Sequence, residues 1–189
     1  MTKSRVEALT DGIIAIAATI MVLELGIPSS NDWSGLLEIK HTVLSYVNSF
    51  FMIYLFWSMH HDLFKKAETI TRKTFVVNGI WTLILTFIPF TTTWVGDAPD
   101  ATVPEFLYAL NILLCVVAVQ WLEYNVRKDN PDGSFEKASK THYRFILCGI
   151  LAVCIVLAFV MPRCSIYLMI ITALVSVVWS IIRKRRTSG

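Results

Sequence analysis

Long apolar runs are the feature of this sequence that most restricts its fold. Six of them, each about 20 residues long, cover residues 5–25, 44–61, 75–94, 103–124, 144–161 and 165–182. A run of this length is typical of a helix that crosses a bilayer, and it is too long for a barrel strand. The sequence therefore predicts an all-α, polytopic membrane protein with six transmembrane helices, and residues 1–189 form a single domain.

The composition excludes most other classes of protein. Hydrophobic residues make up 55% of the 189 residues, and charged residues only 16%, against roughly 25% in soluble domains. So few charged residues cannot cover a soluble globule. An ordinary soluble enzyme, a disordered chain and a nucleic-acid-binding tail are excluded, and no nucleic-acid partner is expected.

The positive charges indicate how the helices are oriented. With the N-terminus in the cytoplasm, 15 of the 17 Lys and Arg fall in cytoplasmic segments, and only Lys40 and Arg163 fall outside. Such an excess marks the cytoplasmic side of a membrane protein. We expect both termini to be cytoplasmic and the inner basic residues to contact anionic membrane lipid.

The first run differs from the others because charge enters its first turns at Arg5, Glu7 and Asp11. Ionisable groups at membrane depth are costly and usually face protein or water. Arg5 and Asp11 are six residues apart, so they lie on different sides of a helix and each needs a partner elsewhere.

An apolar stripe follows these charges. Ile16, Ile20 and Leu23 recur at the spacing of one helix face, and Thr19 borders them. Such stripes are common in helix bundles, so the spacing alone favours a packing surface over a functional one.

Two histidines, His60 and His61, stand at the inner end of the second run, near Trp57. Adjacent residues point about 100° apart on a helix, so the pair cannot easily bind one metal ion. We expect no metal and no cofactor, and instead a hydrogen-bonded cluster with Arg5 or Asp11. Four other polar residues are expected to hydrogen-bond between helices: Ser45, Asn48, Ser49 and Asn78.

No motif for catalysis is present. The chain has no GxSxG, P-loop or HExxH sequence and no Ser-His-Asp pattern. It also has no evident pair of matched interrupted helices of the kind that forms a transporter site. We expect a protein that is not an enzyme.

The first run begins with a specific motif. Residues 5–17, Arg-Val-Glu-Ala-Leu-Thr-Asp-Gly-Ile-Ile-Ala-Ile-Ala, resemble the Arg-x-x-x-Phe-Ser-Asp signature of the transmembrane protein 175 family of potassium channels, with Leu9 for Phe and Thr10 for Ser. Residues 22–25, residues 57–64 and the run from Phe87 to Phe90 before a threonine cluster are similar too. The resemblance covers essentially the whole chain.

The resemblance implies a passive, potassium-preferring cation channel. One six-helix repeat per chain assembles as a homotetramer, and the first helices line a central pore for monovalent cations, with K⁺ as the permeant ion. A carbonyl filter is absent from the family, and this sequence has no TVGYG. The single repeat implies the plasma membrane of a prokaryote.

Site residues follow from their distance to the signature aspartate. The resemblance implies an apolar constriction at Ile16, with Ile20 and Leu23 as further layers and the hydroxyl of Thr19 beside them. It also implies a structural network that holds the helices, with these members: Arg5, Thr10, Asp11, Trp57 and either His60 or His61.

Two other functions stay open. Asp11, Glu24 and the histidines would also suit a proton-coupled transporter or a proton conductor. A non-conducting membrane scaffold or assembly subunit is the third hypothesis.

Overall fold

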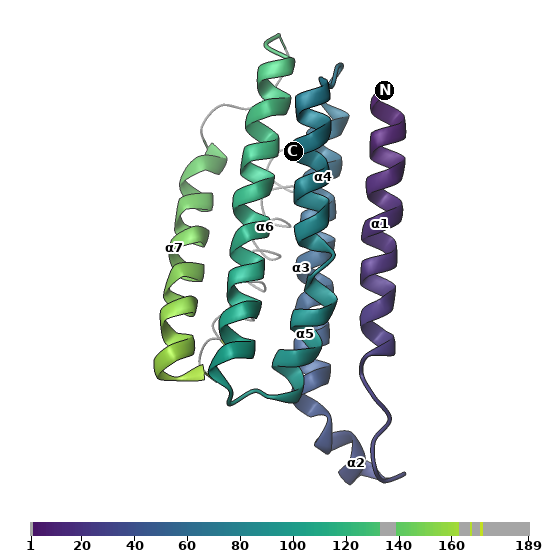
Figure 1. The fold of residues 1–189 in the computed structure, drawn as a ribbon, viewed down its shortest axis with the longest axis vertical. Helices are drawn as coiled ribbons and strands as arrows, with labels where there is room; N and C mark the ends of the chain where they lie inside the picture. Colours follow the sequence, from purple (N-terminus) through teal and green to yellow (C-terminus); the bar gives the residue numbers. More distant parts are fainter. Residues whose placement is uncertain (1, 133–138, 163–166, 168–170, 172–189) are drawn as a thin grey trace, which may run out of the picture.

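The computed structural model describes residues 2–132, 139–162, 167 and 171, with the side chains of 139–147 left aside. Every regular element in that part of the chain is a helix (Figure 1). The helices are α1 (Lys3–Leu23), α2 (Trp33–Glu38), α3 (Lys40–Lys65), α4 (Arg72–Leu85), α5 (Ile88–Asp97), α6 (Thr102–Asp129) and α7 (Ser139–Val160).

Four segments of the described part are long and apolar enough to cross a membrane: Lys3–Leu23, Lys40–Lys65, Arg72–Asp97 and Thr102–Asp129. They coincide with the first four runs predicted from the sequence, and α7 overlaps the fifth. The sixth run, 165–182, lies outside the described residues. An all-helical, multi-pass membrane protein is therefore confirmed for the described part of the chain.

The long helices alternate in direction (Figure 1). The start of α1, the α3–α4 connection and the end of α6 lie together at one end of the bundle, and α2 and the α5–α6 connection lie at the other. Basic residues gather at the first end, including Lys3, Lys65, Arg72 and Arg127. The spatial arrangement thus has the charge asymmetry expected from the sequence.

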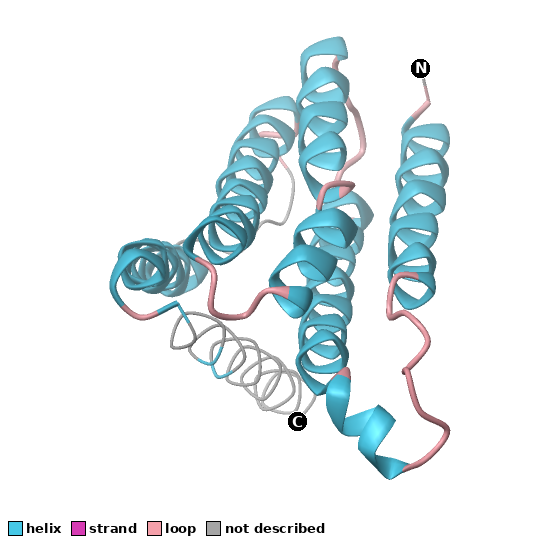
Figure 2. Cartoon of the chain, turned by 60° about the horizontal axis from the view of Figure 1, so that its bottom comes forward, coloured by secondary structure: helices cyan, strands magenta, loops and turns pink. Residues whose placement is uncertain are grey.

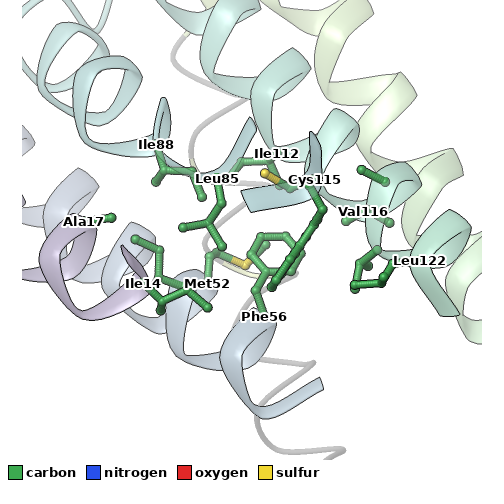
Figure 3. Packing of buried hydrophobic residues seen from close by; sticks show 14 of the residues in the cluster. Ile14, Ala17, Met52, Phe56, Leu85, Ile88, Ile112, Cys115, Val116 and Leu122 are labelled. Carbon is green, nitrogen blue, oxygen red and sulfur yellow. The ribbon is translucent and has the colours of Figure 1, made fainter. Parts of the chain in front are cut away.

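The helix α6 occupies the interior of the bundle and packs against α3, α4, α5 and α7. By contrast, α1 lies at one edge, opposite α7 (Figure 2), and packs on α3, α4 and α5. Ile14 and Ala17 point from α1 toward Met52, Leu85 and Ile88 (Figure 3). The pore helix inferred from the sequence is thus attached to its own chain by one face.

The third predicted span is broken into α4 and α5, where the sequence predicted one helix over 75–94. Pro89 has no N–H and its ring conflicts with the carbonyl four residues earlier, so the helix must bend or break in the turn before it. The Ile84 carbonyl instead accepts a bond from the Phe87 N–H (3.2 Å) and one from Asn111 Nδ2 on α6 (2.9 Å). Asn111 Oδ1 accepts the Thr91 hydroxyl at 3.3 Å. Asn111 therefore holds both sides of the break.

Polar side chains also join α3, α5 and α6 in the bundle interior. Asn48 Nδ2 donates to the Tyr108 hydroxyl at 2.8 Å, and the Ser49 hydroxyl lies 2.8 Å from the same oxygen. Thr92 Oγ1 lies 2.7 Å from Ser49 Oγ. Ser45 differs from the expectation, because its buried hydroxyl has no hydrogen-bond partner among the described residues. Thus the polar residues of α3 hydrogen-bond between helices at two of these positions.

The short helix α2 begins at Asp32, whose carboxylate accepts bonds from the N–H groups of Ser34 (2.9 Å) and Gly35 (3.3 Å). The hydroxyls of Ser34 and Ser30 also donate to it. These bonds, with the Ser34 hydroxyl contributing most, lower the pKa of Asp32 to about 2. This cap fixes the connection between α1 and α3.

Candidate pore helix and inner network

The apolar stripe of α1 lies on its exposed face. Ile16 is 59% exposed, Ile20 42% and Leu23 79%, and Thr19 is exposed as well. The buried face of the same helix consists of Val6, Thr10, Ile14, Ala17 and Met21. Within the single chain the stripe is therefore not a packing surface, and its apolar side chains are available to other copies or to an axial pore.

Thr19 adds a polar group to this face. Its hydroxyl donates to the Ile16 carbonyl at 3.0 Å, one turn earlier in the helix. The proton is thus used inside the helix, and the lone pairs of the oxygen remain on the exposed side. An oxygen in this state can accept a hydrogen bond or face a cation.

At the inner end, the structure brings Asp11 of α1 together with α3. Trp57 Nε1 donates to Asp11 Oδ1 at 3.0 Å. The ring of His61 stacks on Trp57 with the ring centroids 5.5 Å apart. These contacts lie at the surface of the chain, and they join the signature aspartate to one histidine of the pair through the indole.

The other histidine is part of a separate, buried chain of hydrogen bonds. Asn78 Nδ2 on α4 donates to Thr10 Oγ1 at 2.8 Å, and Asn78 Oδ1 lies 3.0 Å from His60 Nε2. With the Asn78 amide nitrogen directed to Thr10, its oxygen faces the histidine, and a hydrogen bond there requires the tautomer of His60 that carries its proton on Nε2. The His60 ring stacks between Phe64 and Trp81, at centroid distances of 4.0 and 5.2 Å. Three helices, α1, α3 and α4, are joined at this point.

Arg5 stands apart from both groups. Its side chain is exposed and makes no hydrogen bond or ion pair with any residue that the structure describes. Lys3 holds the start of α1 instead, because Lys3 Nζ donates to the carbonyls of Phe64 and Ala67, both at 2.8 Å. Both carbonyls lie at the C-terminal end of α3, where the helix dipole favours a cation.

Sequence reasoning missed two members of this region. Asn78 was expected to bond between helices, but nothing in its spacing linked it to Thr10 or to His60. Lys3 looked like an ordinary charge at the cytoplasmic side. The end of α3 offers free carbonyls that could accept a bond from Lys3. Whether those carbonyls face the first turn of α1 depends on how the two helices pack.

A family model described as the endosomal/lysosomal potassium channel TMEM175 matches residues 5–89. The crystal structure of a lysosomal potassium-selective channel TMEM175 homologue from Chamaesiphon minutus superposes with a TM-score of 0.83 at 26% sequence identity, over 94% of this chain and 97% of that one. The resemblance to the TMEM175 family inferred from the motif at residues 5–17 is thus confirmed, by the sequence match over residues 5–89 and by the fold.

Individual TMEM175 relatives match over shorter lengths. A potassium channel of a Chryseobacterium species is 34% identical over 123 residues, which cover 65% of this chain and 64% of that channel. The chain therefore spans less than two thirds of the length of that relative. The human endosomal/lysosomal proton channel TMEM175 is 34% identical over 100 residues, 47% of this chain and 19% of the human protein. The proteins that match are named as ion channels and not as enzymes, in agreement with the expectation from the sequence.

Proposed function

We propose that this chain is the subunit of a potassium-preferring cation channel in which α1 lines the pore. The observation that carries the proposal is the exposed apolar face of α1, in a chain whose fold matches a potassium-selective channel from Chamaesiphon minutus. Residues 1–189 form one six-helix channel domain with both termini in the cytoplasm of a prokaryote and the helices in its plasma membrane. Its partners are further copies of this chain, membrane lipid and monovalent cations, with no nucleic acid and no cofactor.

The channel is a homotetramer with fourfold symmetry around α1. One helix per chain cannot enclose an axial pore, so several copies must each supply one. An α1 attached to its own chain by one face leaves the opposite face free for this purpose. Native mass spectrometry or cross-linking in the membrane should give four subunits, and a preparation of monomers or dimers that still conducts would contradict the assembly.

The constriction consists of four Ile16 side chains, with Ile20 and Leu23 as further layers toward the outside. Isoleucine offers no polar group to replace the hydration shell of an ion, so such a ring is a dry neck that must widen or hydrate before ions pass. Thr19 places a ring of hydroxyl oxygens beside this neck, and we assign the preference for potassium to it.

The inner residues hold α1 in place for this task. Asp11 with Trp57 and His61, and Thr10 with His60, join the pore helix to α3 and α4 through the bonds given above.

A flux assay tests the proposal. The purified protein is reconstituted in liposomes, and uptake of radioactive rubidium is driven by a potassium gradient with equal pH on both sides. A potassium-preferring channel gives uptake that collapses with the potassium gradient and needs no proton gradient. If properly assembled tetramers show no rubidium uptake, the result would favour a non-conducting scaffold and overturn the proposal.

A proton conductor is the second candidate function. One observation favours it: the human relative is named a proton channel. In the same liposomes, a proton conductor acidifies or alkalises the interior when only a pH gradient and a membrane potential are applied. A proton-coupled transporter instead moves rubidium only while the pH gradient lasts.

A further inference from the structure

A groove of about 760 Å³ runs between α1 and α5. The wall on α1 is aliphatic and includes Ile16 and Ile20 of the apolar stripe, and the wall on α5 includes Pro89, Phe90 and Trp94. The rings of Phe90 and Trp94 are adjacent, with centroids 5.6 Å apart. The break before α5 forms this wall, because it turns the proline and both rings toward α1.

The groove has a negative end and no positive one. Glu24 and Asp97 line it where α1 and α5 both finish, and no lysine or arginine is among its lining residues. The carboxylate of Glu24 makes no bond with any described residue, and one oxygen of Asp97 accepts the Thr42 hydroxyl at 3.2 Å. The hydroxyl of Thr93 in the same wall donates to its own helix, at the Pro89 carbonyl.

We propose that this groove binds a lipophilic organic cation, with the ammonium head between Glu24 and Asp97 and the apolar body against Phe90 and Trp94. A small-molecule site is typically a concave, mostly apolar pocket of about 300–1,000 Å³ with a few polar groups that fix orientation. The two carboxylates select a positive charge, and the aromatic faces attract it further. An anion would meet only carboxylates at that end.

Binding at this place acts on α1. Because Ile16 and Ile20 belong to the groove wall, an occupant restrains the outer half of the pore helix and reduces conduction. This second step rests on the proposed channel function, whereas binding itself depends on the groove of the chain alone. The two can therefore be measured separately.

The binding experiment uses radiolabelled tetrapentylammonium in equilibrium dialysis against the full chain in lipid nanodiscs, with empty nanodiscs subtracted. We expect saturable binding, and at least tenfold weaker binding of tetramethylammonium, which has the charge without the apolar body. Glu24→Gln combined with Asp97→Asn should weaken tetrapentylammonium binding at least tenfold, and Trp94→Leu several-fold. Glu7→Gln, the same substitution on α1 outside the groove, should leave binding unchanged.

The Glu24→Gln variant alone keeps the test decisive if the double variant fails to assemble. The carboxylate of Glu24 has no bond to any described residue, so its replacement should not affect folding, and at least threefold weaker binding is expected. No saturable binding would overturn the proposal and favour another copy of the chain as the occupant of the groove. Equal binding by these variants and the wild-type chain would also overturn it, because the cation would then bind elsewhere. Rubidium flux is measured in parallel: binding without any flux in the free protein refutes the channel but leaves the site intact.

Discussion

Replacing Asn111 with leucine should show how much the Asn111 side chain stabilises the break between α4 and α5. Asn111 is buried on α6, and it bonds to the Ile84 carbonyl on one side of the break and to Thr91 on the other. Leucine keeps the size of the side chain and removes both bonds. A buried hydrogen bond contributes about 1 kcal/mol net, and somewhat less between helices in a membrane, so we expect Asn111→Leu to lower the free energy of unfolding by about 1–2 kcal/mol.

The same substitution should cost less in a chain that carries Pro89→Ala. Alanine restores the missing N–H, so a continuous helix can supply backbone partners for the carbonyls that the break leaves open. In that background the carbonyls no longer need the Asn111 side chain as a partner. Asn111→Leu should then lower the free energy of unfolding by less than about 0.5 kcal/mol. The difference between the two costs is the coupling energy of a double-mutant cycle.

Reversible unfolding in mixed micelles, followed by circular dichroism, measures both costs. Asn125→Leu is the matched control, because Asn125 is a buried residue of the same helix whose side chain bonds to the Trp121 carbonyl of its own α6. Its cost should be the same with proline or alanine at position 89. If Asn111→Leu also costs the same in both backgrounds, Asn111 does not act on the break and the reasoning is wrong.

Three further predictions concern α1. Ile16→Asn places amide dipoles in the proposed neck, so rubidium flux should rise or selectivity fall in assembled tetramers. Ile14→Val, a change on the buried face, should do neither. Unchanged flux and selectivity in the Ile16→Asn channel would show that the constriction lies elsewhere. Thr19→Ala should leave conduction intact and reduce the preference for potassium over sodium in bi-ionic measurements, since the hydroxyl ring is lost. Asp11→Ala removes a bond to the indole on α3 and should reduce the yield of tetramer on size-exclusion chromatography more than Glu7→Ala; equal yields would show that the aspartate is merely solvated.

Much of the fold could be predicted because lipid imposes length and polarity on every span. The stripe at Ile16, Ile20 and Leu23 could be placed on one face from helical spacing, and the structure puts that face outside the chain's own core. Whether the third span bends or breaks could not be predicted from Pro89 alone. The outcome depends on Asn111, which lies on another helix.

The inner residues show the same limit more clearly. Both histidines look alike in sequence, yet His60 is buried against Asn78 whereas His61 stacks on Trp57 near the surface. The choice between them depends on the rotation of α3 relative to α4, which no local pattern records. Arg5 was expected in the network because a charge in a span is costly, but the first turn of α1 leaves it exposed. The motif therefore predicted where the inner residues gather, but not which of them contact one another.

The bond between Thr10 and Asn78 also has a consequence for biosynthesis. Its two residues are separated by 68 positions, so at a synthesis rate of about 5–20 residues per second the partner of Thr10 leaves the ribosome about 3–14 s later. During that interval α1 enters the membrane with its inner polar groups bonded to water or to the insertion machinery. We expect substitutions at Asn78 to leave the insertion of α1 unchanged and to impair its later packing against α4.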